Sequence, residues 1–176
     1  MSHFLKQLQV IYLKPGEIFF SKRPTLITTI LGSCLAVCMY NFSNGLAGIC
    51  HVLLPSCGRE HRCNNSCTDM FRYLNCTMKY MVWSFEKNGV SKKDIDVKVF
   101  GGSDILITPQ NGSMRKSVGK QNIEMAKKIL HNERMEAKIF HVGGSFGRKI
   151  YFFTDSGEIF MKRIKKSLLQ KEAIEI

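Results

Sequence analysis

The stretch that decides the fold runs from residue 25 to residue 40 and reads TLITTILGSCLAVCMY. It is rich in β-branched and apolar residues, which favour strands, and only Gly32 and Ser33 interrupt it. Glycine permits backbone conformations that other residues avoid, so a tight break is expected at this point. We therefore predict two short strands separated by a sharp turn, with Cys34 directly after the turn.

Apolar runs and turn residues predict the other elements. Strands are expected at 9–13, 45–54, 97–100, 138–142, 149–153 and 158–162. Residues 69–87 carry apolar side chains three and four positions apart, which predicts a helix ending at Asn88-Gly89. Residues 122–132 are predicted as a second helix, and 165–176 as a short helix or a frayed end. Strands outnumber helices, so we expect an α/β or α+β sandwich whose sheet is built from both ends of the chain.

Length and composition favour one domain that covers residues 1–176. The chain has 176 residues, of which 44% are hydrophobic, and this is enough for one buried core. It contains no apolar run as long as a signal peptide or a membrane span, so we expect a cytoplasmic protein without membrane insertion. Seven cysteines cannot all pair within one chain, and reduced thiols are expected.

The formal net charge of +12 leaves the kind of partner open. Clustered lysines attract nucleic acid, anionic membrane surfaces or acidic proteins. Here the basic residues are scattered, with only local groups such as Lys92-Lys93 and Lys127-Lys128. We interpret the charge mainly as ordinary surface charge, with an acidic partner protein as the next alternative. Nucleic-acid binding would rest on net charge alone and is not expected.

Cys34 is the candidate nucleophile. A thiol becomes reactive when an imidazole, a cation or a helix N-terminus helps to ionise it. His51 lies 17 positions later in a predicted neighbouring strand and could act as the general base. Thr28, six residues before Cys34, offers a hydroxyl to orient the imidazole. Gly32 and Ser33 would let nearby backbone amides face a developing oxyanion. Such a cysteine and histidine are structural more often than catalytic, so the pattern alone does not decide.

Blocks of sequence around these residues resemble the CheD family of chemoreceptor glutamine deamidases. The first blocks are KPGE at 14–17, ILGSCLAVCMY at 30–40 and GICHVLLP at 48–55. Later blocks follow in the same order: RY at 72–73, VFGG at 99–102, VGKQNIE at 118–124 and GGSFGRKI at 143–150. The resemblance covers about residues 9–163, and residues 164–176 would be a C-terminal tail or short helix.

The resemblance implies a cysteine-dependent hydrolase with Cys34, His51 and Thr28 as its catalytic set. Its thiolate would attack glutamine side chains of methyl-accepting chemotaxis receptors, release ammonia through a thioester and leave glutamate. It also implies a CheC-type phosphatase as a partner, and no cofactor or resident metal. The implied fold is a three-layer α/β sandwich of mixed sheets with flanking helices, related to the catalytic domains of deamidating bacterial toxins.

The chain departs from the family pattern at three places. Leu74 and Asn75 stand where family members usually carry glycine and aspartate, and Ser145-Phe146 replaces a more usual Asn-His. None of these is a predicted catalytic residue. In the comparison with the family, the glycines at 101–102 and 143–147 would shape the rim of the active site. Arg148 is then either a cation that faces the substrate or a solvated surface side chain.

Two alternatives stay open at the level of the sequence. Cys57, Cys63 and Cys67, with His51 and His61 nearby, could form a zinc site, although they lack the paired spacing typical of such sites. Zinc that used His51 would remove the base, so the two interpretations exclude each other. The chain could also be a non-catalytic interaction module that binds a CheC-type phosphatase or a receptor.

Overall fold

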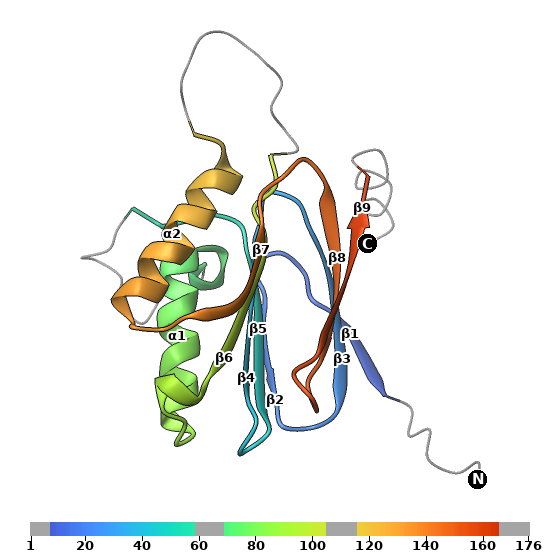
Figure 1. Ribbon diagram of the computed structural model, residues 1–176, viewed down its shortest axis with the longest axis vertical. Helices are drawn as coiled ribbons and strands as arrows, with labels where there is room; N and C mark the ends of the chain where they lie inside the picture. Colours follow the sequence, from blue (N-terminus) through green and yellow to red (C-terminus); the bar gives the residue numbers. More distant parts are fainter. Residues whose placement is uncertain (1–7, 59–68, 105–115, 166–176) are drawn as a thin grey trace, which may run out of the picture.

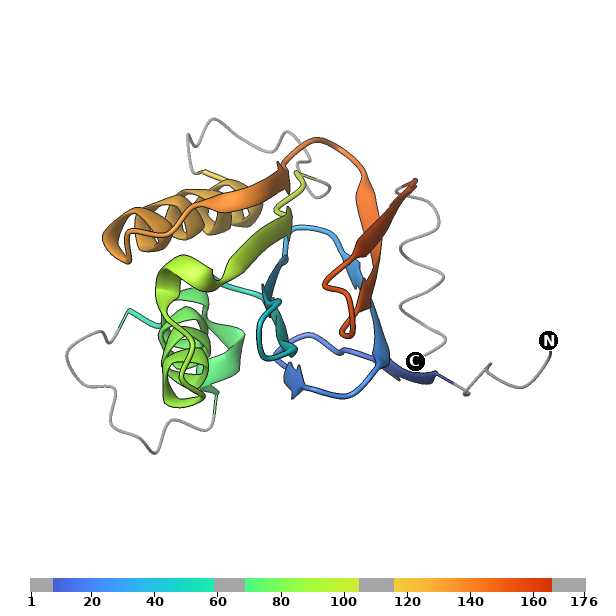
Figure 2. The ribbon, with the colours of Figure 1, turned by 60° about the horizontal axis from the view of Figure 1, so that its bottom comes forward.

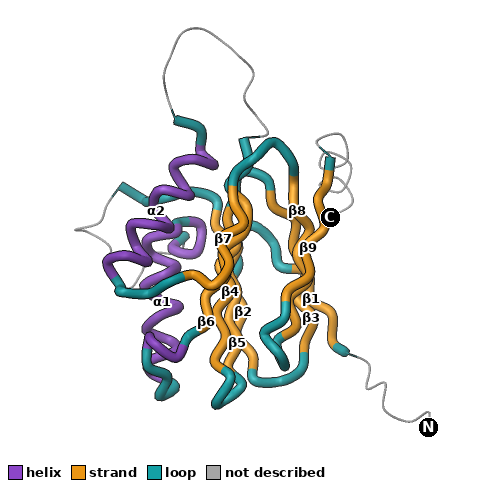
Figure 3. The backbone as a smooth tube through the Cα atoms, viewed as in Figure 1, coloured by secondary structure: helices purple, strands orange, loops and turns teal. Residues whose placement is uncertain are grey.

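The computed structural model describes residues 8–58, 69–104 and 116–165, and these residues form three layers. Two helices form the first layer, a five-stranded sheet the second and a four-stranded sheet the third (Figure 1). Both helices lie on the same side of the five-stranded sheet, and the four-stranded sheet covers its other face (Figures 2 and 3). The predicted three-layer sandwich of mixed sheets with flanking helices is confirmed.

The five-stranded sheet forms the middle layer, and its strand order is β2-β5-β4-β6-β7. Its strands are β2 (Ile18–Ser21), β4 (Leu35–Asn41), β5 (Leu46–Val52), β6 (Asp96–Gly101) and β7 (Ala137–Val142). Every residue of β4 and β5 is buried, because both faces of these strands are covered. This explains why their sequences are almost continuously apolar rather than alternating.

The four-stranded sheet forms the outer layer, and its strand order is β1-β3-β8-β9. Its strands are β1 (Gln9–Tyr12), β3 (Thr25–Leu31), β8 (Gly147–Phe153) and β9 (Ile159–Ile164). Strand β3 alternates between buried and partly exposed residues, because only its inner face meets the middle layer. Ile27, Leu31 and Phe152 are among the side chains that fill the space between the sheets.

Helices α1 (Leu74–Lys87) and α2 (Val118–Asn132) cover the remaining face of the middle sheet. One buried cluster contains residues of α1 and of the β4 face that points toward the helices. From α1 these are Leu74, Met78, Met81 and Phe85, and from β4 they are Leu35, Val37 and Met39. Helix α2 begins after Ser117, whose hydroxyl accepts a hydrogen bond from the Lys120 N–H, the usual N-cap arrangement. Short 3₁₀ turns, η1 (Met70–Arg72) and η2 (Lys92–Asp94), precede α1 and β6.

The predicted strands and both predicted helices are present, with differences at their ends. The structure adds β2, which the sequence analysis did not predict and which pairs with β5. Helix α2 starts at Val118, four residues before the predicted start, because Ser117 caps it. The predicted short helix or frayed end at 165–176 lies almost entirely outside the described residues. Within the described residues, no helix has the length and apolar character that crossing a membrane requires.

The packing of α1 predicts a large loss of stability for Phe85→Ala. Phe85 is fully buried, and removing its ring leaves a cavity between α1 and the middle sheet. We expect the free energy of unfolding to fall by about 3–5 kcal/mol, measured by urea denaturation. Trp83→Ala on the same helix is the control, since Trp83 is 50% exposed. Equal losses for the two variants would contradict this description of the core.

Candidate active site

The His51 imidazole lies between the two sheets and is held there by a threonine hydroxyl. His51 is 2% exposed, and its Nδ1 lies 2.8 Å from Thr29 Oγ1 of β3. The same hydroxyl donates a hydrogen bond to the Leu13 carbonyl oxygen at 2.8 Å. A hydroxyl has one hydrogen, so once it donates to Leu13 it can only accept from His51 Nδ1–H. Both contacts of the hydroxyl are made at once when the proton is on Nδ1 and Nε2 carries the lone pair.

The structure corrects the predicted partner of His51 from Thr28 to Thr29. Side chains alternate along a strand, so adjacent threonines of β3 point to opposite faces. Thr29 shares the inner face with Ile27 and Leu31, whereas Thr28 belongs to the outer, partly exposed set. Thr28 Oγ1 has no hydrogen-bond partner among the described residues. The prediction chose Thr28 from its position six residues before Cys34, but the side chain of Thr28 lies on the face of β3 that points away from His51.

Cys34 and His51 lie on the same side of the middle sheet because β4 and β5 are antiparallel neighbours. Ala36 pairs with His51, and Cys34 lies two residues before Ala36, immediately ahead of β4. Residues two apart share a face of a strand, which places Cys34 on the side of the His51 ring. Cys34 is partly buried against a cluster that includes Ala36 and Phe100. The buried Nε2 of His51 has no hydrogen-bond partner among the described residues.

Backbone contacts from the end of β6 hold the turn that contains Gly32, Ser33 and Cys34. The Ser103 N–H donates to the Gly32 carbonyl oxygen at 2.9 Å, and the Gly102 N–H donates to that of Cys34 at 2.8 Å. Gly101 has a φ of +112°, and a Cβ atom there would lie 2.1 Å from the Cys34 carbonyl oxygen. Only glycine allows β6 to approach the Cys34 backbone so closely.

Burial keeps both candidate catalytic groups uncharged. It raises the pKa of the Cys34 thiol to about 11, although a hydrogen bond from the residue's own N–H acts in the opposite direction. Burial also lowers the pKa of His51 to about 4, and the Leu13 backbone partly offsets this. At neutral pH the resting pair is thus a thiol and a neutral imidazole rather than a thiolate and an imidazolium. A base in this state can take the thiol proton during attack.

Arg148 is buried, which corrects the prediction of a solvated surface side chain and leaves a role toward the substrate as a prediction. The residue is 1% exposed, although it lies in β8 beside Leu31, next to the turn. Its guanidinium donates to Ser103 Oγ at 2.5 Å and to the Gly143 carbonyl oxygen at 2.7 Å. A further bond runs from Nε to His141 Nδ1 at 3.0 Å, and burial lowers the pKa of Arg148 to about 10. Arg148 thus fastens the β7–β8 connection to Ser103, which in turn holds Gly32.

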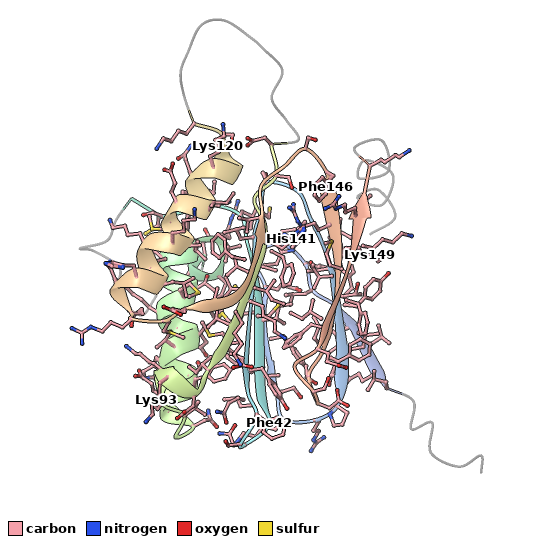
Figure 4. The ribbon with its side chains drawn as sticks, viewed as in Figure 1. Phe42, Lys93, Lys120, His141, Phe146 and Lys149 are labelled. Carbon is pink, nitrogen blue, oxygen red and sulfur yellow. The ribbon has the colours of Figure 1, made fainter. Side chains whose placement is uncertain are left out.

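The Arg148 contacts lie at one end of the sandwich. His141 and Phe146 are drawn at the end of the sheets nearest the start of α2, where Lys120 is labelled (Figure 4). The guanidinium carbon of Arg148 lies 4.6 Å from the centre of the Phe146 ring. Phe42, on the β4–β5 hairpin, is at the opposite end.

The zinc alternative finds no support among the residues that can be described. Cys63, Cys67 and His61 lie outside them. Within the described ranges, no group of three or more His, Cys, Asp or Glu side chains is placed to hold a metal ion. Cys57 lies instead 3.9 Å from Cys76 of α1, measured between the sulfur atoms.

Sequence reasoning missed Thr29 and Asn122. Thr29 carries the same hydroxyl as Thr28, and only the alternation of β3 distinguishes them. Asn122 lies far away in the sequence, yet its side chain donates to the Ser33 and Leu53 carbonyl oxygens at 3.0 Å each. The one available signal was its place in the block VGKQNIE, which resembles a CheD block.

Fold and site together define a class of protein: an α/β sandwich with a cysteine beside a buried, neutral histidine. Comparison with known proteins then gives the family. The family described as "CheD chemotactic sensory transduction" matches residues 53–163, and the chain belongs to the CheD family. This match begins after Cys34 and His51, so it does not itself test their roles.

Curated relatives extend the similarity to most of the chain. The chain is 38% identical over 161 residues to "Probable chemoreceptor glutamine deamidase CheD 2" of Geobacter sulfurreducens, covering 92% of this chain and 94% of that protein. A "Probable chemoreceptor glutamine deamidase CheD" of Maridesulfovibrio salexigens is 31% identical, covering 90% and 94%. The one of Sulfurimonas denitrificans is 33% identical, covering 89% and 95%.

Among solved structures, Bacillus licheniformis hypothetical protein YfiH aligns with a TM-score of 0.40 and 14% identity. The alignment covers 73% of this chain and 50% of that chain. This likeness is too low to add to the description of the fold.

The Thr29 contact predicts a single histidine tautomer that depends on Thr29 and not on Thr28. In ¹⁵N NMR spectra, we expect His51 to carry its proton on Nδ1. Thr29→Val removes the acceptor and should give a mixture of tautomers, whereas Thr29→Ser keeps it and should restore the single form. Thr28→Val is the matched control and should leave the His51 signals unchanged. A tautomer change in Thr28→Val alone would show that the two threonines have been assigned the wrong roles.

Proposed function

We propose that this chain is a chemoreceptor glutamine deamidase in which Cys34 is the nucleophile and His51 the general base. The observation that carries the proposal is the buried His51 ring, with Nδ1 fixed by Thr29 and Nε2 left without a partner among the described residues, beside Cys34. The names of the curated relatives supply the substrate class, a glutamine side chain on a chemoreceptor.

The first half of the reaction forms a thioester. His51 Nε2 takes the Cys34 proton while the sulfur attacks the carboxamide carbon, so both groups begin uncharged. Backbone N–H groups at the Gly32-Ser33-Cys34 turn stabilise the oxyanion that develops on the carboxamide oxygen. The imidazolium then protonates the leaving nitrogen, the C–N bond breaks and ammonia departs.

The second half restores the enzyme. His51 takes a proton from water, the resulting hydroxide attacks the thioester carbon, and the C–S bond breaks. The proton on His51 returns to the Cys34 sulfur, which leaves glutamate on the protein substrate. Every proton that moves in the two halves passes through Nε2, and for this reason the tautomer set by Thr29 matters.

A receptor cytoplasmic fragment tests the proposal directly. With the wild-type enzyme we expect a mass gain of about one dalton for each modified glutamine, from the replacement of NH₂ by OH, together with ammonia. Cys34→Ala should abolish both, while Cys57→Ala, which removes another partly buried thiol, should not. His51→Ala should lower kcat by about 10²–10⁴-fold.

Two results would count against the proposal. Activity retained in Cys34→Ala would remove the nucleophile. Receptor binding by wild type without any mass gain would favour the non-catalytic interaction module, which no observation supports at present.

The pH dependence should reflect the lowered pKa of His51. A histidine with its usual pKa of 6.5 would become protonated and lose activity below neutral pH, but burial lowers this pKa to about 4. The base therefore stays neutral and competent down to about pH 5. We expect kcat/KM to be nearly constant between pH 5 and pH 8 and to fall as the pH approaches 4. An acid limb centred near 6.5 would contradict the buried, neutral imidazole.

The family resemblance also suggests a protein partner, a CheC-type phosphatase, that would bind at the deamidase site. This partner and a cytoplasmic location stay predictions. The strongly basic chain, with a formal charge of +12, would favour association with an acidic protein surface.

A further inference from the structure

Asn122 of α2 links the segment before β4 to the segment after β5, close to both members of the candidate catalytic pair. Its Nδ2 donates to the carbonyl oxygen of Ser33, the residue before the nucleophile, and to that of Leu53, two residues after His51. Both distances are 3.0 Å, and Asn122 is fully buried. A primary amide has two N–H hydrogens, so each carbonyl receives one. If the Asn122 amide were rotated by 180°, its Oδ1 would face two carbonyl oxygens and could accept no hydrogen bond from them. Nδ2 must therefore be the atom that faces them.

Helix α2 can reach the turn because two glycines remove side chains from the contact. A Cβ atom on Gly119 would lie 2.5 Å from the Gly102 carbonyl oxygen. A Cβ atom on Gly102 would lie 2.7 Å from the Ile123 side chain. The helix backbone therefore packs directly on the end of β6, and this close approach brings Asn122 within hydrogen-bonding distance of the turn.

Planarity of the peptide bond carries the effect of Asn122 to Cys34. The Ser33 C=O and the Cys34 N–H belong to one trans peptide and point in opposite directions. Fixing the carbonyl on α2 therefore turns the Cys34 N–H away from the helix. The same N–H lowers the pKa of the Cys34 thiol against the effect of burial, so its direction bears on how readily the sulfur ionises. A hydrogen bond to the carbonyl also polarises the peptide, which strengthens the N–H as a donor.

We propose that Asn122 is a positioning residue of this enzyme: it fixes the Ser33–Cys34 peptide against the His51 strand so that the Cys34 N–H faces the charge developing on sulfur and substrate oxygen. This inference rests on the proposed function for its catalytic part. Its effect on Cys34 itself does not require any substrate.

Two measurements on Asn122→Ala test the proposal. The first is turnover of the receptor fragment, where we expect kcat to fall about 10–100-fold, less than the loss of a whole oxyanion donor, with KM changed less than about threefold. The second is alkylation of Cys34 by iodoacetamide at pH 9, followed by mass spectrometry of the peptide that contains it. We expect a rate about tenfold lower, the change that one pKa unit makes in the thiolate fraction.

Asn41→Ala is the matched control for the loss of a buried amide. Asn41 is also buried, and its Nδ2 donates to the Asp94 carbonyl oxygen while its Oδ1 accepts from the Asn44 N–H. It lies at the far end of β4 from Cys34, next to Phe42 (Figure 4). Asn41→Ala should lower stability but leave both kcat and the alkylation rate unchanged for the folded protein. If Asn122→Ala does not fold, Asn122→Leu keeps much of the volume, removes both donors without adding a charge and should give the same two losses.

The outcomes separate this proposal from the proposed function. If Asn122→Ala slows the alkylation of Cys34 while the wild-type protein shows no deamidation, the positioning role stands and the proposed activity is overturned. Deamidation by wild type with unchanged kcat and alkylation in the Asn122 variants would overturn the positioning role alone. Equal losses in Asn41→Ala would show that Asn122 acts only through stability, which also overturns it.

Discussion

Burial of β4 and β5 on both faces is the constraint on which the rest of the structure depends. Helices cover one side of these strands and the second sheet covers the other, so every residue of both strands is buried. A polar side chain in such a place must find a hydrogen-bond partner, because an unpaired buried donor costs about 1–3 kcal/mol. His51 finds one across the gap between the sheets, at Thr29. The hydrogen bond therefore both satisfies a buried ring and fixes which nitrogen is basic.

The same burial decides the resting state of the site. Desolvation disfavours the charged form of any group, which raises the pKa of Cys34 and lowers that of His51. A separated ion pair would have little water to stabilise it, so in the proposed reaction proton transfer would accompany bond formation with the substrate. In the proposed reaction, backbone donors that Asn122 has already oriented before the substrate arrives would stabilise that charge without a cost for reorganisation.

Much of the fold was predictable because its signals are local. The break at Gly32-Ser33, the apolar run of β5 and the helical spacing of α1 each depend on neighbours in the sequence. The strand β2 was missed because its four residues follow turn chemistry at Lys14-Pro15-Gly16-Glu17 and carry little pattern of their own. What makes them a strand is pairing with β5, a contact that the local sequence does not encode.

For the candidate site, the sequence by itself determined the Cys34 thiol, the His51 imidazole and the turn directly before Cys34, since these depend on residue type and on the spacing of neighbouring strands. The tertiary structure alone decided which threonine meets His51, because that depends on which face of β3 packs inward. It also decided that Arg148 points into the protein and that Asn122 reaches the turn. These contacts join segments that lie far apart in the sequence, and only the packing of α2, β6 and β8 around the turn brings them together.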